Sequence, residues 1–195
     1  IYEKDIKLLL AHSSVAQIGY IALGFGLASA ASVTASFIHI GNHALIKGGL
    51  FMAVGSFVVV LGSRANLASF VGIGRRMPIT ATAFTICGLS LAGLPLTAGF
   101  ISKLYLVRAI LASDAYFIAG LVLLSSALSL IYLWKIVEVM WMQPAPAKSP
   151  KLFENPAIYL PLWIVALANI WFGVDASWLV AASRAAAAAL LGGGL

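Results

Sequence analysis

Residues 32–61 of the 195-residue chain have the sequence SVTASFIHIGNHALIKGGLFMAVGSFVVVL, an apolar run longer than one membrane crossing. About 20 mostly apolar residues are enough for a helix to cross a bilayer. The run nevertheless contains His39, His43 and Lys47, each four residues from the next. This spacing places the three side chains on one face of a helix. The segment therefore predicts a spanning helix with one ionisable face.

The rest of the composition also indicates a membrane protein. The chain is 62% hydrophobic and 9% charged, whereas soluble domains carry about 25% charged residues. We predict an all-α membrane protein that forms one transmembrane domain over 1–195, without strands, repeats or a catalytic domain. Its five spanning helices are expected at about 6–28, 32–61, 78–112, 116–142 and 156–173. An Ala-rich tail at 176–191 follows, and it either lies in the interface or ends the last span.

The basic residues lie unequally on the two sides that such helices would define. With alternating helices, one side holds Lys4, Lys7, Arg64, Arg75, Arg76, Lys148 and Lys151. The other side holds only Arg108 and Arg184. Cytoplasmic loops carry an excess of Lys and Arg, so we expect the N-terminal stretch in the cytoplasm and the C-terminus outside. The net charge of +6 is thus explained by topology, and no nucleic-acid motif accompanies it.

The aligned ionisable groups predict a proton path. Histidine titrates near neutral pH, and a charge in a spanning segment is costly unless it faces a protein or water interior. His39, His43 and Lys47 could relay protons along their helix. In the alternative interpretation, the histidines satisfy partners on a neighbouring helix and Lys47 extends toward the interface. A His-x3-His pair could also bind zinc, but no third ligand lies nearby in the sequence.

The segment 78–112 is expected to be broken near its middle. Pro95 removes a helical hydrogen bond, while Gly93 and Gly99 permit an unwound stretch. Irregular backbone at membrane depth is tolerated where it lines a cavity or is buried in protein, and transporters place ion sites there. Lys103 would then face a polar cavity that Thr97 and Ser102 help to line. A simple proline kink, with Lys103 at a helix end, is the alternative.

Other chemistry is not indicated. His12 lies about one turn inside the first helix and could take up protons, although a surface histidine is the default. The single cysteine, Cys87, excludes an internal disulfide and a Cys-rich metal site. We expect no metal or cofactor of the chain's own. No nucleophile arrangement or phosphate loop favours an enzyme in its own right. Ile1 in place of Met leads us to expect a fragment of a longer subunit.

Three stretches of the sequence resemble one family. They are residues 4–20 (KDIKLLLAHSSVAQIGY), the helix with His39, His43 and Lys47, and residues 93–103 (GLPLTAGFISK). In order and spacing they are similar to the antiporter-like subunits shared by respiratory complex I, membrane-bound hydrogenases and Mrp antiporters. The match covers roughly the first 140 residues. Within the family, residues 75–78 and 93–103 look most like the D-type subunit of Mrp antiporters.

The resemblance implies a fold and a role. The family has fourteen helices with two inverted five-helix repeats, and this chain would hold the last five, including the second repeat's broken helix. The charged axis would run through His39, His43 and Lys47 to Lys103, the terminal lysine of the second half-channel. The chain departs from the family in having His12 where tyrosine is common. It also lacks the Glu and Lys pair of the first half-channel.

Three functions are therefore open. The first hypothesis is proton translocation as a subunit of a Mrp-type cation/proton antiporter in the bacterial inner membrane. Its partners would be other membrane subunits, the lipid bilayer, protons, and sodium or potassium. The second is a proton-pumping subunit of a complex I-like or hydrogenase redox complex, which would be part of an NADH:quinone oxidoreductase-like translocase. The third is a non-transporting scaffold subunit.

Overall fold

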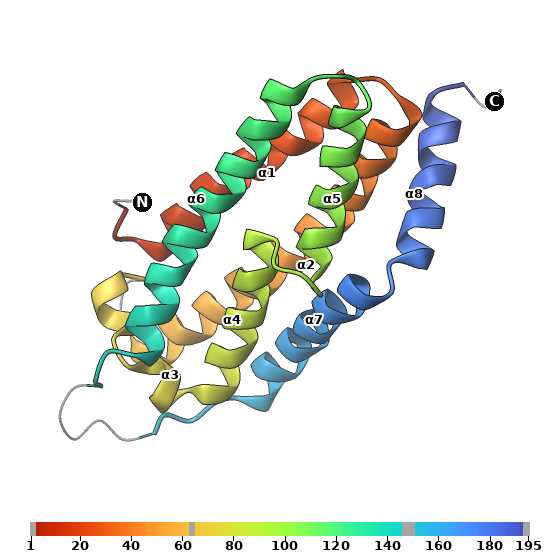
Figure 1. Cartoon of the computed structure of the whole chain (residues 1–195). Helices are drawn as coiled ribbons and strands as arrows, with labels where there is room; N and C mark the ends of the chain where they lie inside the picture. Colours follow the sequence, from red (N-terminus) through yellow and green to blue (C-terminus); the bar gives the residue numbers. More distant parts are fainter. Residues whose placement is uncertain (1–2, 63–64, 146–150, 193–195) are drawn as a thin grey trace.

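The computed structural model describes residues 3–62, 65–145 and 151–192, and this part of the chain is built from helices (Figure 1). Its elements are α1 (Ile6–Gly26), α2 (Ala30–Leu61), the 3-10 helix η1 (Leu67–Phe70), α3 (Ile73–Arg76), α4 (Pro78–Ala92), α5 (Ala98–Leu111), α6 (Tyr116–Trp141), α7 (Pro156–Val174) and α8 (Ser177–Leu190). The described residues contain no strand, only an isolated bridge between Asp5 and Asn66. The predicted all-α class is confirmed.

Four helices of the described part are long and apolar enough to cross a membrane, namely α1, α2, α6 and α7. Their ends lie within two residues of the ranges expected from the sequence. The chain is thus a multi-pass membrane protein, while a count of five crossings stays a prediction. The sequence did not predict η1 and α3, which lie between α2 and α4. The expectations for Ile1, Arg64 and Lys148 concern positions outside the described residues.

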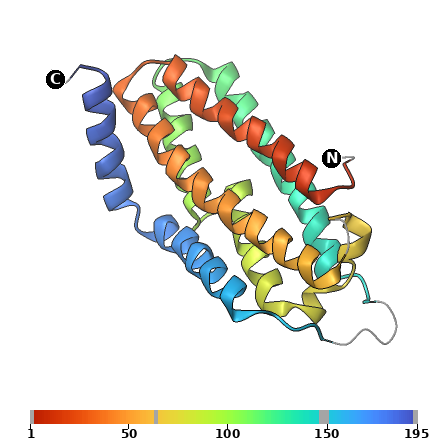
Figure 2. The ribbon, with the colours of Figure 1, turned by 180° about the vertical axis from the view of Figure 1, so that it is seen from behind.

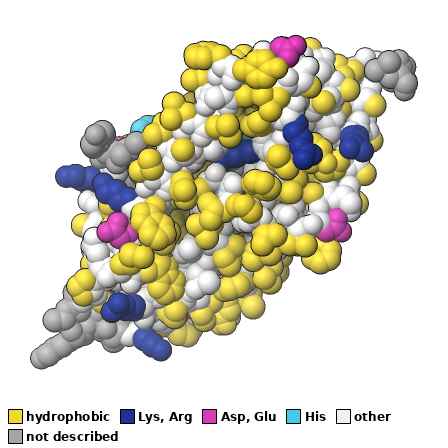
Figure 3. All heavy atoms as spheres, viewed as in Figure 1, with side chains coloured by type: hydrophobic (Ala, Val, Ile, Leu, Met, Phe, Trp, Pro, Cys, Tyr) yellow, Lys and Arg dark blue, Asp and Glu magenta, His cyan; other side chains and the backbone are white. Residues whose placement is uncertain are grey.

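The surface agrees with a lipid environment. Large apolar side chains on α6 point outward, among them Phe117, which is 79% exposed, and Ile131, which is 55% exposed. Figure 3 shows hydrophobic side chains spread over the face that α5, α6 and α8 present. A soluble protein would not expose so many large apolar groups together.

Helix α2 is the centre of the bundle. Ser29 and Ser32 form a reciprocal cap at its N-terminus, and Gly62 ends it in a left-handed conformation. It packs against α1, α4, α5, α7 and α8. Figures 1 and 2 show from opposite sides that α2 runs along most of the molecule. Its polar residues are therefore enclosed by neighbouring helices.

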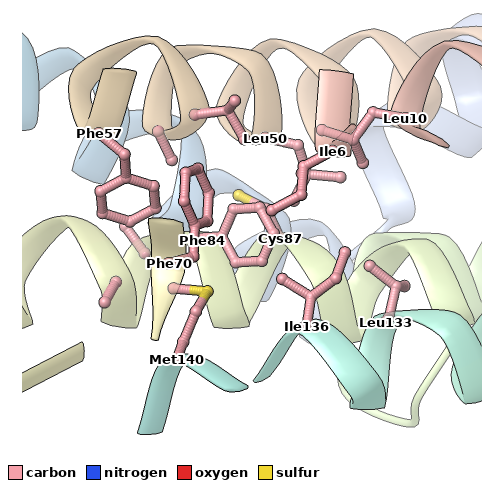
Figure 4. Packing of buried hydrophobic residues seen from close by; sticks show 14 of the residues in the cluster. Ile6, Leu10, Leu50, Phe57, Phe70, Phe84, Cys87, Leu133, Ile136 and Met140 are labelled. Atoms are coloured by element: carbon pink, nitrogen blue, oxygen red, sulfur yellow. The ribbon is translucent and has the colours of Figure 1, made fainter. Parts of the chain in front are cut away.

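An apolar core fixes one end of the bundle (Figure 4). The ring of Phe57 on α2 lies 5.1 Å from that of Phe70 and 6.3 Å from that of Phe84 on α4. Met140 and Ile136 of α6 are fully or almost fully buried in the same cluster. Burial of such side chains stabilises the fold by about 1.5–3 kcal/mol each. The core holds α1, α2, α4 and α6 together beside the polar region.

The segment 78–112 is two helices in the structure. Helix α4 ends at Ala92, and α5 begins at Ala98. Gly93 follows α4 with φ 87, and Leu96 has φ 65, a conformation that is rare for a residue with a side chain. Pro95 stands between the helices, where its missing N–H interrupts neither.

Helix α7 supports this break from the side. A methyl group on Gly173 would overlap the backbone of Leu96 and Thr97, so the glycine permits close contact with the connection between α4 and α5. The expected tail forms α8, which begins after Asp175 (Figure 1). It packs against α2.

Candidate functional site

Lys103 lies inside the bundle at the break between α4 and α5, with 7% of its surface exposed. Its Nζ donates to the carbonyl oxygens of Leu91 at 2.9 Å and Ala92 at 3.0 Å. These are the last two residues of α4, and a helix C-terminus has unpaired carbonyls and the negative end of the helix dipole. The lysine therefore caps α4 from a position on α5.

Polar side chains join the two half-helices to α7. Ser90 Oγ donates to Asn169 Oδ1 at 2.9 Å, and it accepts from the backbone N–H of Gly99 at 3.2 Å. All three residues are buried. The hydroxyl of Thr97 donates to the carbonyl of Leu94 at 2.6 Å, within the break. These side chains therefore supply hydrogen-bond partners to the Gly99 N–H and the Leu94 carbonyl at the break.

His39 links three helices. Its Nδ1 lies 2.9 Å from Ser102 Oγ on α5, and its Nε2 lies 3.1 Å from Gln17 Oε1 on α1. A carboxamide oxygen can only accept, so Nε2 donates, and in neutral histidine Nδ1 is then an acceptor. The single hydroxyl proton of Ser102 has two acceptors within reach, Nδ1 and the carbonyl of Gly99 at 3.2 Å. The side chain is 2% exposed. These contacts fit a proton-transfer group, and they equally fit the structural histidine of the alternative interpretation.

His43 stacks on His39, with ring centroids 6.2 Å apart and planes 8° from parallel. Its side chain is half-buried, and its Nδ1 is a buried atom without a hydrogen-bond partner among the described residues. One residue away, Asn42 Nδ2 donates to the carbonyl of Ala98 at 2.6 Å, at the start of α5. Helix α2 therefore also contacts the start of α5, beside the break between α4 and α5.

Lys47 stands one turn further along α2 and is 7% exposed. Its Nζ donates to the carbonyl oxygen of Leu10 at 2.6 Å and also to Ser13 Oγ. Both partners belong to α1. The ammonium therefore points into the protein, not toward the interface.

Tyr20 of α1 contacts both His39 on α2 and Lys103 on α5. Its ring meets that of His39 edge to face at 5.6 Å, and Lys103 Nζ lies 5.8 Å from its centroid. A cation at this distance from an aromatic face is stabilised by the ring quadrupole. Tyr20 thus lies beside both His39 and Lys103.

The four ionisable side chains of the site, all among the described residues, follow one another through the bundle without direct hydrogen bonds between them. In the described part of the chain, no hydrogen bond directly joins Lys47, His43, His39 and Lys103 to one another. Buried polar atoms without partners lie among them, namely Gln17 Nε2, Asn42 Oδ1 and His43 Nδ1. Buried polar atoms are nearly always satisfied by protein or water. A path along these groups therefore requires water between them.

His12 lies apart from this series. It is exposed on α1 and lines a cavity between α1 and α6. A second cavity, of about 170 Å³, is lined by Lys103 of α5 and Ser126 of α6. Among the described residues, no three His, Cys, Asp or Glu side chains come together as a metal site would require.

Several site residues were not singled out from the sequence. Among them are Ser13, Gln17, Tyr20, Asn42, Ser90 and Asn169. A signal existed for α1, because residues 13, 17, 20 and 24 share one buried face of an otherwise apolar helix. No such signal existed for Asn169, which is an isolated amide in an apolar helix.

The fold and the site together define a polytopic helical membrane protein with a broken helix and two enclosed lysines. Residues 1–129 match the family described as "NADH:quinone oxidoreductase/Mrp antiporter, TM". The chain belongs to this family, as the resemblance predicted.

Individual proteins show the same relationship. NADH-quinone oxidoreductase subunit N of Desulforudis audaxviator is 38% identical over 146 residues, which are 75% of this chain and 29% of that protein. A chain of the membrane-bound sulfane sulfur reductase, an archaeal respiratory membrane complex, is 31% identical to this chain and superimposes with a TM-score of 0.89. The match covers 97% of this chain and 38% of that chain. A chain of the Mrp complex from Dietzia sp. is 25% identical to this chain and superimposes with a TM-score of 0.88. The match covers 98% of this chain and 44% of that chain. The chain therefore spans less than half the length of each of these proteins.

Proposed function

We propose that this chain is the proton-translocating part of a membrane subunit in a multi-subunit complex. The supporting observation is that Lys47 and Lys103, on separate helices, are each 7% exposed and directed into the bundle. Neither has a carboxylate partner among the described residues. Ammonium groups at such depth are costly, and in membrane proteins they mark ion or proton pathways.

The path proposed from the sequence runs along His39, His43, Lys47 and Lys103. Protons would move by short transfers among these groups and water. Two ammonium groups in a low-dielectric interior repel each other, so protonation of one lysine disfavours protonation of the other. A charge change in a neighbouring part of the subunit would then shift the proton from one lysine to the other.

A redox-driven complex is the better-supported setting, which places our second sequence hypothesis ahead of the first. NADH-quinone oxidoreductase subunit N and the sulfane sulfur reductase chain are both more than 30% identical to this chain. The Mrp complex remains the second candidate because its chain has the same fold at a TM-score of 0.88. An antiporter would require sodium or potassium for proton movement, and a redox pump would require an electron donor instead.

We further propose the topology that the sequence indicated. The described chain would supply the last five helices of a fourteen-helix subunit, with α4 and α5 together forming one broken crossing. The N-terminus of α1 lies beside the C-terminal end of α2, because Ile6 N–H donates to the carbonyl of Ala65 at 2.7 Å. The excess of basic residues at this end favours the cytoplasmic side of a bacterial inner membrane. The C-terminus would lie outside.

The test replaces Lys103 with alanine in the assembled complex and measures proton uptake into vesicles. We expect translocation to be lost while the complex still assembles. Lys135→Ala is the matched control, because Lys135 is an exposed lysine on α6 outside the proposed path. Normal proton uptake by the assembled Lys103→Ala complex would refute the proposal.

The scaffold hypothesis makes a different prediction. Replacing His39, His43 and Lys47 together would then leave translocation intact and affect assembly alone. Driving the same vesicles with an electron donor, or with a sodium or potassium gradient, would separate the redox pump from the antiporter.

A further inference from the structure

A second polar region lies outside the path described so far, between α1 and α6. It is a cavity of about 250 Å³. Its polar lining comes from Glu3, His12, Ser13, Ser125, Ser129 and Tyr132. This contrasts with the cavity at Lys103, where Lys103 and Ser126 are the only polar side chains among the described residues. Leu9, Ala16 and Leu128 complete the lining of the cavity between α1 and α6. This cavity therefore offers water more hydrogen-bond partners than the cavity at Lys103 does.

Three hydroxyl groups come together in this lining. The hydroxyl oxygen of Tyr132 is buried, and it interacts with the side chains of Ser13 and Ser129. Because each hydroxyl can both donate and accept, the three offer several hydrogen-bond partners to water. A cavity of this size accommodates several waters beside polar groups.

Ser13 separates this cavity from Lys47. The serine is 6% exposed and lines the cavity, while its Oγ accepts a hydrogen bond from Lys47 Nζ. The hydroxyl also donates to the carbonyl of Leu10 at 2.8 Å. Lys47 itself does not line the cavity. One hydroxyl group thus stands between the cavity and the enclosed lysine.

We infer that this cavity is the route by which protons reach Lys47, with Ser13 as the relay between its water and the lysine. The inference rests on the proposed function. When Lys47 is a neutral amine, the Ser13 hydroxyl turns from Leu10 and donates its hydrogen bond to Nζ. Hydronium in the cavity gives a proton to the serine oxygen while the serine gives its own proton to Nζ, so that no alkoxide forms and water is left. The hydronium O–H bond and the serine O–H bond break, and an N–H bond and a new serine O–H bond form. The net change is one proton moved from hydronium to Lys47.

Ser14 offers a matched control. Its hydroxyl donates to the same carbonyl of Leu10, at 3.2 Å, but it neither lines the cavity nor bonds to Lys47. We expect Ser13→Ala to slow proton uptake by the assembled complex roughly tenfold or more. Ser14→Ala should stay within about twofold, because it removes no relay group. Ser13→Thr keeps a hydroxyl and should restore uptake.

A labelling experiment tests the cavity without measuring transport. In a Cys87→Ala background, Ser125→Cys should react with a charged, membrane-impermeant thiosulfonate, because Ser125 lines the cavity. The neighbouring Leu124→Cys should not react, since Leu124 is 57% exposed on the apolar surface and does not line the cavity. An unreactive cysteine at position 125 would overturn the aqueous cavity. Equal uptake by assembled Ser13→Ala and Ser14→Ala complexes would overturn the relay.

These results are separable from the main proposal. If Lys103→Ala retains normal uptake, the proposed function fails whatever position 125 shows. If Lys103→Ala abolishes uptake and Ser13→Ala does not slow it, the proton path stands and this access route is wrong.

Discussion

The junction of α4 and α5 should respond sharply to one added methyl group. Gly99 lies in the first turn of α5, where a Cβ atom would overlap the backbone carbonyl of Ser90 and approach Ile46 Cδ1 at 3.3 Å. A carbonyl oxygen of the backbone cannot rotate away as a side chain could. Gly99→Ala must therefore push the end of α4 away from α5.

The magnitude follows from two opposing effects. Overpacking a close contact costs about 1–3 kcal/mol, and a backbone obstacle places this substitution near the upper limit. Alanine has a higher helix propensity than glycine, which stabilises the folded state by about 1 kcal/mol. We expect a net destabilisation of about 2 kcal/mol. Separating α4 from α5 also moves the carbonyls of Leu91 and Ala92 away from Lys103 Nζ, so proton uptake should fall as well.

Gly120→Ala provides the control. Gly120 lies in α6, and its Cβ would meet no described atom within 4 Å apart from its chain neighbours and the nearby backbone of its own helix. This substitution should stabilise the helix by up to about 1 kcal/mol. Thermal unfolding of the purified complex, followed by proton uptake in vesicles, measures both effects. Equal melting temperatures and equal uptake for the two variants would refute the close approach of α4 and α5.

Two further substitutions test how the break and its surroundings are held. Asn169→Ala removes the acceptor of Ser90 and should lower the free energy of unfolding by about 1–3 kcal/mol; an unchanged melting temperature would show that Ser90 needs no partner on α7. Glu154→Gln should cost about 0.5–1 kcal/mol, because the carboxylate accepts the N–H groups of Ile79 and Thr80 at the positive end of α4. That loss should shrink at high salt, and a salt-independent loss would argue against the electrostatic origin.

The sequence predicted the helices well because lipid imposes one simple requirement on them. Apolar runs of sufficient length must be helical, so the ranges of α1, α2, α6 and α7 followed from composition and length. A break was one of the two interpretations of Pro95 between two glycines, and a proline kink in a continuous helix was the other. The small elements η1 and α3 escaped prediction because four-residue helices leave no periodic signal.

The site was predictable only in part. The shared face of His39, His43 and Lys47 followed from helical spacing. The partners of these groups depend on which helices pack together, and a single sequence does not encode that as a local pattern. Lys103 illustrates the limit, because its contact with the end of α4 requires α5 to turn back at the break. Gln17 lies in a stretch that carries the family resemblance, but its contact with His39 depends on α1 packing against α2.

The length of α2 has a consequence for how the protein sits in a bilayer. Its 32 residues extend over about 48 Å at 1.5 Å per residue, whereas the hydrocarbon layer is about 30 Å thick. An upright α2 would project well beyond the acyl chains, so the helix must cross obliquely, extend into the headgroup layer, or do both. Lengthening or shortening the lipid chains should therefore reorient α2 and its neighbours together, which makes bilayer thickness a physical variable for this subunit.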